Sequence, residues 1–134
     1  PRDAEAIFLE PNTGDIYLIS KREEQVGLYR IAYPFNFRAK NIARRLASLP
    51  LNWVTAADLS SNGKQLLVKT YTGIYKYKTK LDDNKNITLS KEAKTMAYLT
   101  EPQGEALCWD AKNKGYFTLS ESAKGITQTL YYYK

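Results

Sequence analysis

The chain of 134 residues contains no histidine and a single cysteine, Cys108. Without histidine, the commonest general base and the commonest transition-metal ligand are both missing. This excludes Ser–His and Cys–His catalytic pairs and His-based zinc sites built from this chain alone, and one cysteine excludes an internal disulfide. We expect Cys108, which lies in a predicted strand, to be a buried small side chain. No apolar run approaches the roughly 18–20 residues of a membrane-spanning helix.

The composition is that of a globular domain, with 43% hydrophobic and 25% charged residues. Twenty Lys and Arg face fourteen Asp and Glu, a net charge of +6 that nucleic acid or another anionic partner can match. Lys76, Lys78 and Lys80 alternate with tyrosines, which is typical of the solvent-facing side of an outer strand. Interleaved aromatics can also stack on bases. Because no helix-turn-helix, zinc-finger or RNP-like signature accompanies them, nucleic acid is the less favoured partner.

A repeat of about fifty residues organises the sequence. Segments 4–20, 54–69 and 104–120 share landmarks spaced by fifty residues, among them Glu5, Thr55 and Glu105, then Ala6, Ala56 and Ala106. Each segment has two apolar runs separated by a turn containing Asn or Gly, such as Asn62-Gly63. The pattern therefore predicts three β-hairpins.

Further strands are expected to follow each hairpin. Third strands are predicted at 28–32, 74–78 and 129–133, after loops that contain Gly27, Gly73 and Gly125. Segments 40–49 and 91–99 occupy the place of a fourth strand, although their Ala, Lys and Leu content also suits helix. The repeat context favours strand. The predicted units are about 4–49, 53–99 and 103–134, within one domain spanning 1–134.

A period near fifty with four strands per unit is the pattern of β-propeller blades. The segment 57–69 closely resembles the hairpin of TolB-like and WD40-like bacterial propellers, and departs from it at Ser61-Asn62, where those families usually have Pro-Asp. The Glu-Ala starts of the other two segments resemble, more loosely, phytase-like and lactonase-like propellers. The resemblance implies an all-β fold, a β-propeller of about three four-stranded antiparallel blades, the last lacking its outer strand.

Natural propeller rings usually have four to eight blades, so the resemblance implies half of a ring of about six. An exposed blade face and an unpaired edge should not persist alone. We therefore expect association with a second copy of the chain or with a complementary half-propeller. Since propellers of these types are often bacterial and exported, a periplasmic or secreted location is favoured over a cytoplasmic one.

Antiparallel hairpins bring the start of each first strand and the end of each second strand to the same side. In related propellers that side holds the ligand site, at the mouth of the channel. The predicted ligand-binding residues delivered there are Glu5, Lys21, Arg22, Thr55, Tyr71, Glu105 and Glu121; Asp3, Asp58, Thr70 and Ser120 accompany them.

Two interpretations of these carboxylates stay open. Glu5 and Glu105 can hold Ca²⁺, which prefers oxygen ligands, or one of them can act as an acid or base. Alternatively they pair with Lys21 or Arg22 and serve the structure. Asp58 is expected to tie down the hairpin that follows it.

Two functions follow from these interpretations. The favoured one is a non-enzymatic propeller scaffold that binds a small ligand or a protein partner, because no complete catalytic constellation is visible. The alternative is a Ca²⁺-dependent phytase-like or lactonase-like hydrolase, with Glu5 and Glu105 as metal ligands. The resemblance is specific for fold and carries no chemistry by itself.

Overall fold

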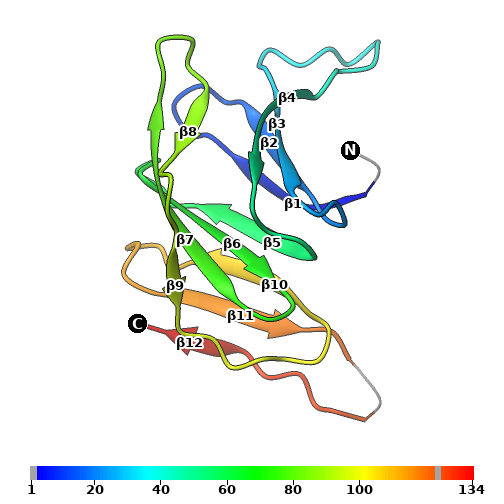
Figure 1. Ribbon diagram of the computed structural model, residues 1–134, viewed down its shortest axis with the longest axis vertical. Helices are drawn as coiled ribbons and strands as arrows, with labels where there is room; N and C mark the ends of the chain where they lie inside the picture. The colour runs from blue at the N-terminus through cyan, green and yellow to red at the C-terminus, as the bar shows by residue number, and fades with distance from the viewer. Residues whose placement is uncertain (1–2, 123–124) are drawn as a thin grey trace.

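A computed structural model describes residues 3–122 and 125–134, and these residues form three antiparallel sheets of four, five and three strands (Figure 1). The predicted all-β class is confirmed. Within the described residues there is no helix long and apolar enough to cross a membrane.

The first sheet has the order β1-β2-β3-β4, with strands Ala4–Leu9, Ile16–Ser20, Val26–Ile31 and Arg44–Leu49. The fourth segment is thus a strand, as the repeat context predicted, because it pairs with β3. Gly27 was expected in a loop but lies within β3. A Cβ on Gly27 would lie 2.5 Å from Cε2 of Tyr29, so this aromatic ring covers the glycine.

The second sheet differs from the four strands expected. Its strands β5 to β9 are Val54–Leu59, Gln65–Thr70, Ile74–Leu81, Ile87–Leu89 and Lys94–Met96. The long β7 pairs with β8 along its second half and with β9 along its first half. Segment 91–99 therefore contributes only three paired residues. Lys76, Lys78 and Lys80 lie on β7, which is an internal strand because β6 flanks it on its other side.

The third sheet has three strands, β10 (Gly104–Trp109), β11 (Tyr116–Ser120) and β12 (Tyr131–Tyr133). The prediction of a last unit with one strand fewer is confirmed for the described residues. Gly125, with φ of 78°, lies in the connection before β12.

The same irregularity in register recurs in the three hairpins. Pairing shifts between Ala4 and Ala6, between Val54 and Ala56, and between Gly104 and Ala106. Each shift leaves one extra residue on the first strand, which is the geometry of a β-bulge. The extra residues are Glu5, Thr55 and Glu105. This register confirms the fifty-residue repeat at the level of backbone geometry.

Left-handed residues close the hairpin turns, as the Asn and Gly content predicted. Gly14, Gly63 and Asn113 have φ values of 75°, 68° and 53°. A polar side chain that opens each turn also accepts backbone N–H groups. Glu10 accepts from Asn12 and Thr13 at 2.9 and 2.6 Å, and Ser60 and Asp110 do the same in their turns.

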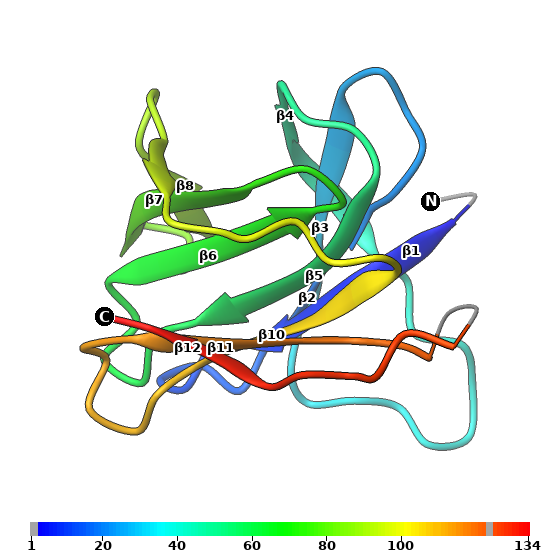
Figure 2. The ribbon, with the colours of Figure 1, turned by 90° about the horizontal axis from the view of Figure 1, so that it is seen from below.

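The three sheets stack through their first strands, so that β5 lies between β1 and β10 (Figures 1 and 2). The first two sheets share one core, built from two sets of buried side chains: Ala6, Phe8, Tyr17 and Ile19 from the first sheet, and Val54, Ala57, Leu59, Leu66 and Val68 from the second. The second and third sheets share a smaller core of Leu67, Ile74 and Tyr116.

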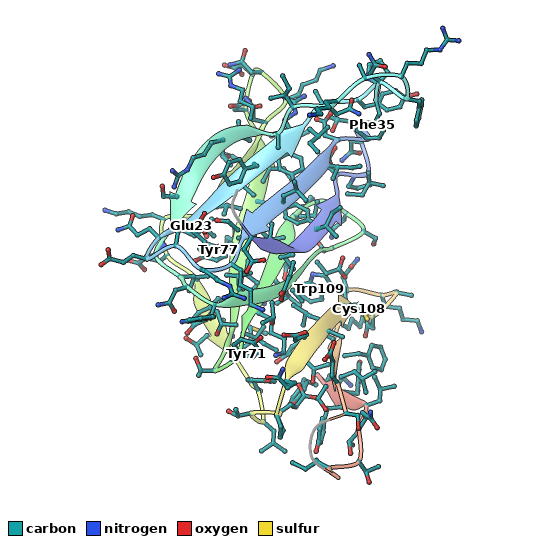
Figure 3. The ribbon with its side chains drawn as sticks, turned by 90° about the vertical axis from the view of Figure 1, so that its right-hand side faces the viewer. Glu23, Phe35, Tyr71, Tyr77, Cys108 and Trp109 are labelled. Atoms are coloured by element: carbon teal, nitrogen blue, oxygen red, sulfur yellow. The ribbon has the colours of Figure 1, made fainter. Side chains whose placement is uncertain are left out.

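Cys108 is exposed, so its predicted burial is wrong. It lies opposite Phe117 on the face of the third sheet that turns away from the second. Trp109, the next residue, packs in the core between the two sheets (Figure 3). The second sheet covers one face of β10, so the side chains on that face are packed in the core. No described residue covers the other face, so Cys108 is exposed there.

Asp58 joins two sheets instead of fixing its own hairpin. Its Oδ2 accepts a hydrogen bond of 2.7 Å from the backbone N–H of Trp109, and its carbonyl accepts one of 3.2 Å from the indole N–H. The expectation about Asp58 was wrong because the nearest donor comes from β10, fifty-one residues away in the chain.

We predict that Asp58→Ala lowers the free energy of unfolding by about 1–3 kcal/mol, because it leaves the Trp109 N–H without its acceptor. Asp83→Ala, at an exposed loop position, is the matched control and should change stability by less than about 0.5 kcal/mol. Urea unfolding followed by tryptophan fluorescence measures both. Equal effects of the two substitutions would contradict this role of Asp58.

Candidate functional site

Four side chains from three sheets meet beside the first strands. Glu5 and Glu105 are the extra residues at the bulges of β1 and β10, where the local kink re-aims a side chain. Lys21 and Tyr71 are the first residues after β2 and β6. We call Glu5, Lys21, Tyr71 and Glu105 the Lys21 cluster. Tyr71 lies toward the beginning of β10, while Trp109 lies at its end (Figure 3).

The ammonium group of Lys21 is the centre of this cluster. Its Nζ donates to both carboxylate oxygens of Glu5, at 2.7 and 2.6 Å, and to the hydroxyl of Tyr71 at 3.0 Å. Tyr71 in turn donates to Oε1 of Glu105 at 2.5 Å, and the same oxygen lies 3.6 Å from Lys21 Nζ. One cation therefore connects the carboxylates of two sheets that are not adjacent.

Lys21 is only 4% exposed, yet it remains charged. Burial by itself lowers the pKa of Lys21, but the hydrogen bonds that its ammonium donates to Glu5 and Tyr71 outweigh this effect and hold the pKa well above the usual lysine value. The hydrogen bond to Glu105 raises the pKa of Tyr71. An amine with a raised pKa stays protonated around neutral pH and is then not a nucleophile, so the chemistry of this cluster is that of an ion pair that joins two sheets.

An exposed rim borders the cluster. Arg22 donates to the carboxylate of Asp3, and its guanidinium carbon lies 5.5 Å from the ring centroid of Trp53. Trp53 is about half exposed and lies 6.5 Å from the Tyr71 ring. An open cavity of about 410 Å³ beside these two rings is also lined by Asn52, Thr70 and Thr72.

Sequence reasoning missed Trp53, although the repeat contained the signal. It is the counterpart of Asp3 and Gln103, at positions fifty residues apart. Trp53 and Gln103 share left-handed φ values of 52° and 51°. This unusual backbone therefore recurs at the entry of the second and third hairpins, and Trp53 is the one of the two that borders the cavity.

The remaining predicted residues form other contacts. Thr55 is buried at its bulge, where its hydroxyl lies 3.3 Å from the carbonyl oxygen of Gly104. Thr70 is the buried last residue of β6, and its hydroxyl accepts a hydrogen bond of 3.1 Å from the backbone N–H of Gly73. Ser120 pairs with Gly104 at the end of β11. Glu121 is exposed just beyond it.

The carboxylate pair predicted as a metal site is bridged by a side chain. Lys21 Nζ lies 2.6 Å from Glu5 and 3.6 Å from Glu105, so its charge takes the place that Ca²⁺ would need between them. Among the residues that the structure describes, no three His, Cys, Asp or Glu side chains are grouped as a metal site requires.

A second buried lysine was not anticipated. Lys69 is fully buried on β6, at the position that Ile19 and Leu119 occupy in the other hairpins. Its Nζ donates to the Tyr98 hydroxyl at 2.8 Å and to the carbonyl of Gly104. Burial lowers the pKa of Lys69 to about 8, and the charges of Glu101 and Glu105 offset this only in part.

Glu101 lies near this lysine and is 5% exposed. Within the described part of the chain, neither of its carboxylate oxygens has a hydrogen-bond partner. Lys69 thus connects β6 to the start of β10. Its surroundings lower its pKa, whereas the surroundings of Lys21 raise the pKa of that lysine. The two lysines differ because Lys21 donates hydrogen bonds to a carboxylate, that of Glu5, whereas Lys69 donates to the Tyr98 hydroxyl and to backbone carbonyls.

Comparison with known proteins finds no family model that matches the sequence and no curated protein that matches it.

We predict that Lys21→Met lowers the free energy of unfolding by about 1–3 kcal/mol, because Glu5 and Glu105 lose their shared cation. The partial exposure of Glu5 keeps this below the loss expected for a fully buried pair. Because the pKa of Lys21 is raised, the stabilisation is present below a pH of about 10.5, the ordinary lysine pKa, as long as the carboxylates are ionised, and it is lost as the pH rises through the folded-state pKa. Arg22→Met, in an exposed ion pair, is the control and should cost under about 1 kcal/mol in urea unfolding. A smaller loss for Lys21→Met than for Arg22→Met would contradict this.

Lys69 predicts a distinct dependence on pH. Its folded-state pKa of about 8 lies below the ordinary value of 10.5, so between these values the unfolded chain binds a proton that the folded chain does not. The free energy of unfolding therefore rises with pH across this window, by up to roughly 3 kcal/mol.

The measurement is the difference in unfolding free energy between the wild type and Lys69→Met from pH 7.5 to 10, which cancels the titration of other groups. This difference should increase with pH. The same difference for Lys64→Met, at an exposed turn position, should stay flat. A flat profile for Lys69→Met would show that Lys69 titrates normally.

Proposed function

We propose that this chain is a β-propeller scaffold without enzymatic activity, which forms half of a ring of about six sheets and binds a small ligand or a protein at the channel mouth. The Lys21 cluster and its rim form the binding end. The observation that carries the proposal is the way in which the faces of the three sheets repeat.

Each sheet has a forward face, turned toward the next sheet in the chain, and a backward face, turned toward the preceding one. Residues paired across antiparallel strands share a face. The forward face of the first sheet, with Phe8 and Tyr17, packs on the backward face of the second, with Ala57 and Val68. The forward face of the second sheet, with Leu67, packs on the third in the same way.

Two apolar faces are left at the ends of this stack. The backward face of the first sheet presents Ile7 and Leu9, which are 58% and 56% exposed, with Leu18 and Ile16 paired opposite them. The forward face of the third sheet presents Cys108 and Leu119, both exposed. Because these faces correspond to ones that pack together elsewhere in the chain, each complements the other. Three further sheets of the same kind would cover both.

The cluster supports a binding role better than a hydrolytic one. A Ca²⁺-dependent hydrolase needs carboxylates that are free to bind the metal, whereas Glu5 and Glu105 face the ammonium of Lys21. The rim instead offers a half-exposed Trp53 beside Arg22 and an adjoining open cavity. An aromatic face next to a cation and carboxylates suits a ligand with both apolar and polar groups.

Light scattering tests ring closure with the chain itself. We expect a species of twice the 15.3 kDa chain mass, in which two copies cover each other's open faces. Ile7→Lys and Leu119→Lys, on the two open faces, should each give a single-chain species because a charge is then buried at the contact. Ile42→Lys, at a loop position that is 85% exposed, is the control and should leave the mass unchanged.

A folded wild-type monomer would overturn closure by a second copy. A dimer unaffected by Ile7→Lys and Leu119→Lys would show that association uses another surface.

A further inference from the structure

A groove lined by lysines lies away from the Lys21 cluster. It has a volume of about 1060 Å³ and borders the turns at Asn12 and Gly63, at the other end of the hairpins. Its basic residues are Lys64, Lys76, Lys78, Lys80, Lys91 and Lys94. The strand β7 supplies three of them; Lys64 lies in the β5–β6 turn, Lys91 lies between β8 and β9, and Lys94 is the first residue of β9.

The charge of this lysine groove is not balanced from within. Glu10 and Glu92 are its acidic lining residues, and Glu10 already accepts hydrogen bonds from the backbone of Asn12 and Thr13. The ion pairs among the described residues involve Lys21, Arg22 and Arg30, and none involves a groove lysine. Six cations against two carboxylates therefore leave an excess of positive charge, which attracts an anionic partner.

The lysines of β7 also have a regular spacing. Lys76, Lys78 and Lys80 are alternate residues of one strand, so they point to the same face at intervals of about 6.6 Å. Alternate side chains of any extended peptide repeat at the same interval. A peptide with Asp or Glu at every second position can thus oppose each lysine with a carboxylate.

The lining favours a peptide over nucleic acid. None of the groove residues is aromatic, so bases find no stacking platform, and none is arginine, the residue best suited to clamp phosphates. Leu81 and the methylene stems of the lysines provide apolar contact for a peptide. Thr79, Ser90 and Gln65 provide polar groups. A concave surface also fits an extended chain better than a flat membrane.

We propose that the lysine groove is a docking site for an extended acidic peptide segment with carboxylates at alternate positions. The ion pairs with Lys76, Lys78 and Lys80 orient the segment along β7, and the other three lysines strengthen the attraction. The site does not depend on ring closure or on the Lys21 cluster.

Fluorescence anisotropy tests this site with a labelled ten-residue peptide of alternating Glu and Thr. The triple variant Lys76→Gln, Lys78→Gln and Lys80→Gln should weaken binding about tenfold or more. The control is Lys40→Gln, Lys112→Gln and Lys114→Gln, which removes the same charge from exposed loops and should change the dissociation constant less than threefold. Binding by the wild type should weaken as salt is raised.

Two comparisons make the result decisive. A peptide of alternating Gln and Thr should not bind, and a single-stranded oligonucleotide of ten thymidines should bind more weakly than the acidic peptide. Tighter binding of the oligonucleotide, equal losses in the two triple variants, or no binding of the acidic peptide would each overturn the proposal. Lys78→Gln alone, at an exposed position, gives the direction of the effect should the triple variant fail to fold.

Discussion

The structure depends on one constraint, which is that the first two strands of each unit carry apolar side chains on both faces, with few polar ones among them. A sheet of this kind has to be covered on each side, and the first strands β1, β5 and β10 meet that need by lying next to one another. Both cores follow from this stacking, and so do the contacts of Asp58 and Lys69 across a sheet boundary. The open faces at the two ends follow from it as well, because stacking three such sheets always leaves two faces over.

The β-bulge after the first residue of each first strand positions the polar side chains of the candidate site. The regular pleat would point alternate side chains into the cores, whereas the extra residue is free to point elsewhere. At Glu5 and Glu105 this places two carboxylates where one cation, Lys21 of the first unit, can reach both. At Thr55 the same position holds a hydroxyl in contact with the next sheet. The repeat thus supplies three equivalent backbone positions. The side chain at each position determines whether it forms an ion pair or a hydrogen bond to the neighbouring sheet.

Much of the fold could be predicted from the sequence because its signals are local. The hairpins, their Asn and Gly turns and the fifty-residue register depend on residues close together in the chain. The errors came where distant contacts prevail. Segment 91–99 forms only a short strand because β7 is long enough to pair with two partners. Cys108 is exposed because no described residue covers its face of the stack, and Asp58 binds β10 because the backbone N–H of Trp109 lies 2.7 Å from its carboxylate.

The candidate site, like the fold, was in part predictable from the sequence and in part decided by contacts between sheets. The sequence by itself determined which residues stand at the bulges and at the ends of the second strands, since repeat spacing and strand alternation are properties of the chain. Only the tertiary structure decided that Lys21 would be shared by Glu5, Tyr71 and Glu105, and that Lys69 would be buried with a pKa of about 8. Both outcomes depend on distances between sheets that no local pattern encodes. The free energy of a buried charge is set by the partners within a few ångströms of it, and those partners come from elsewhere in the sequence.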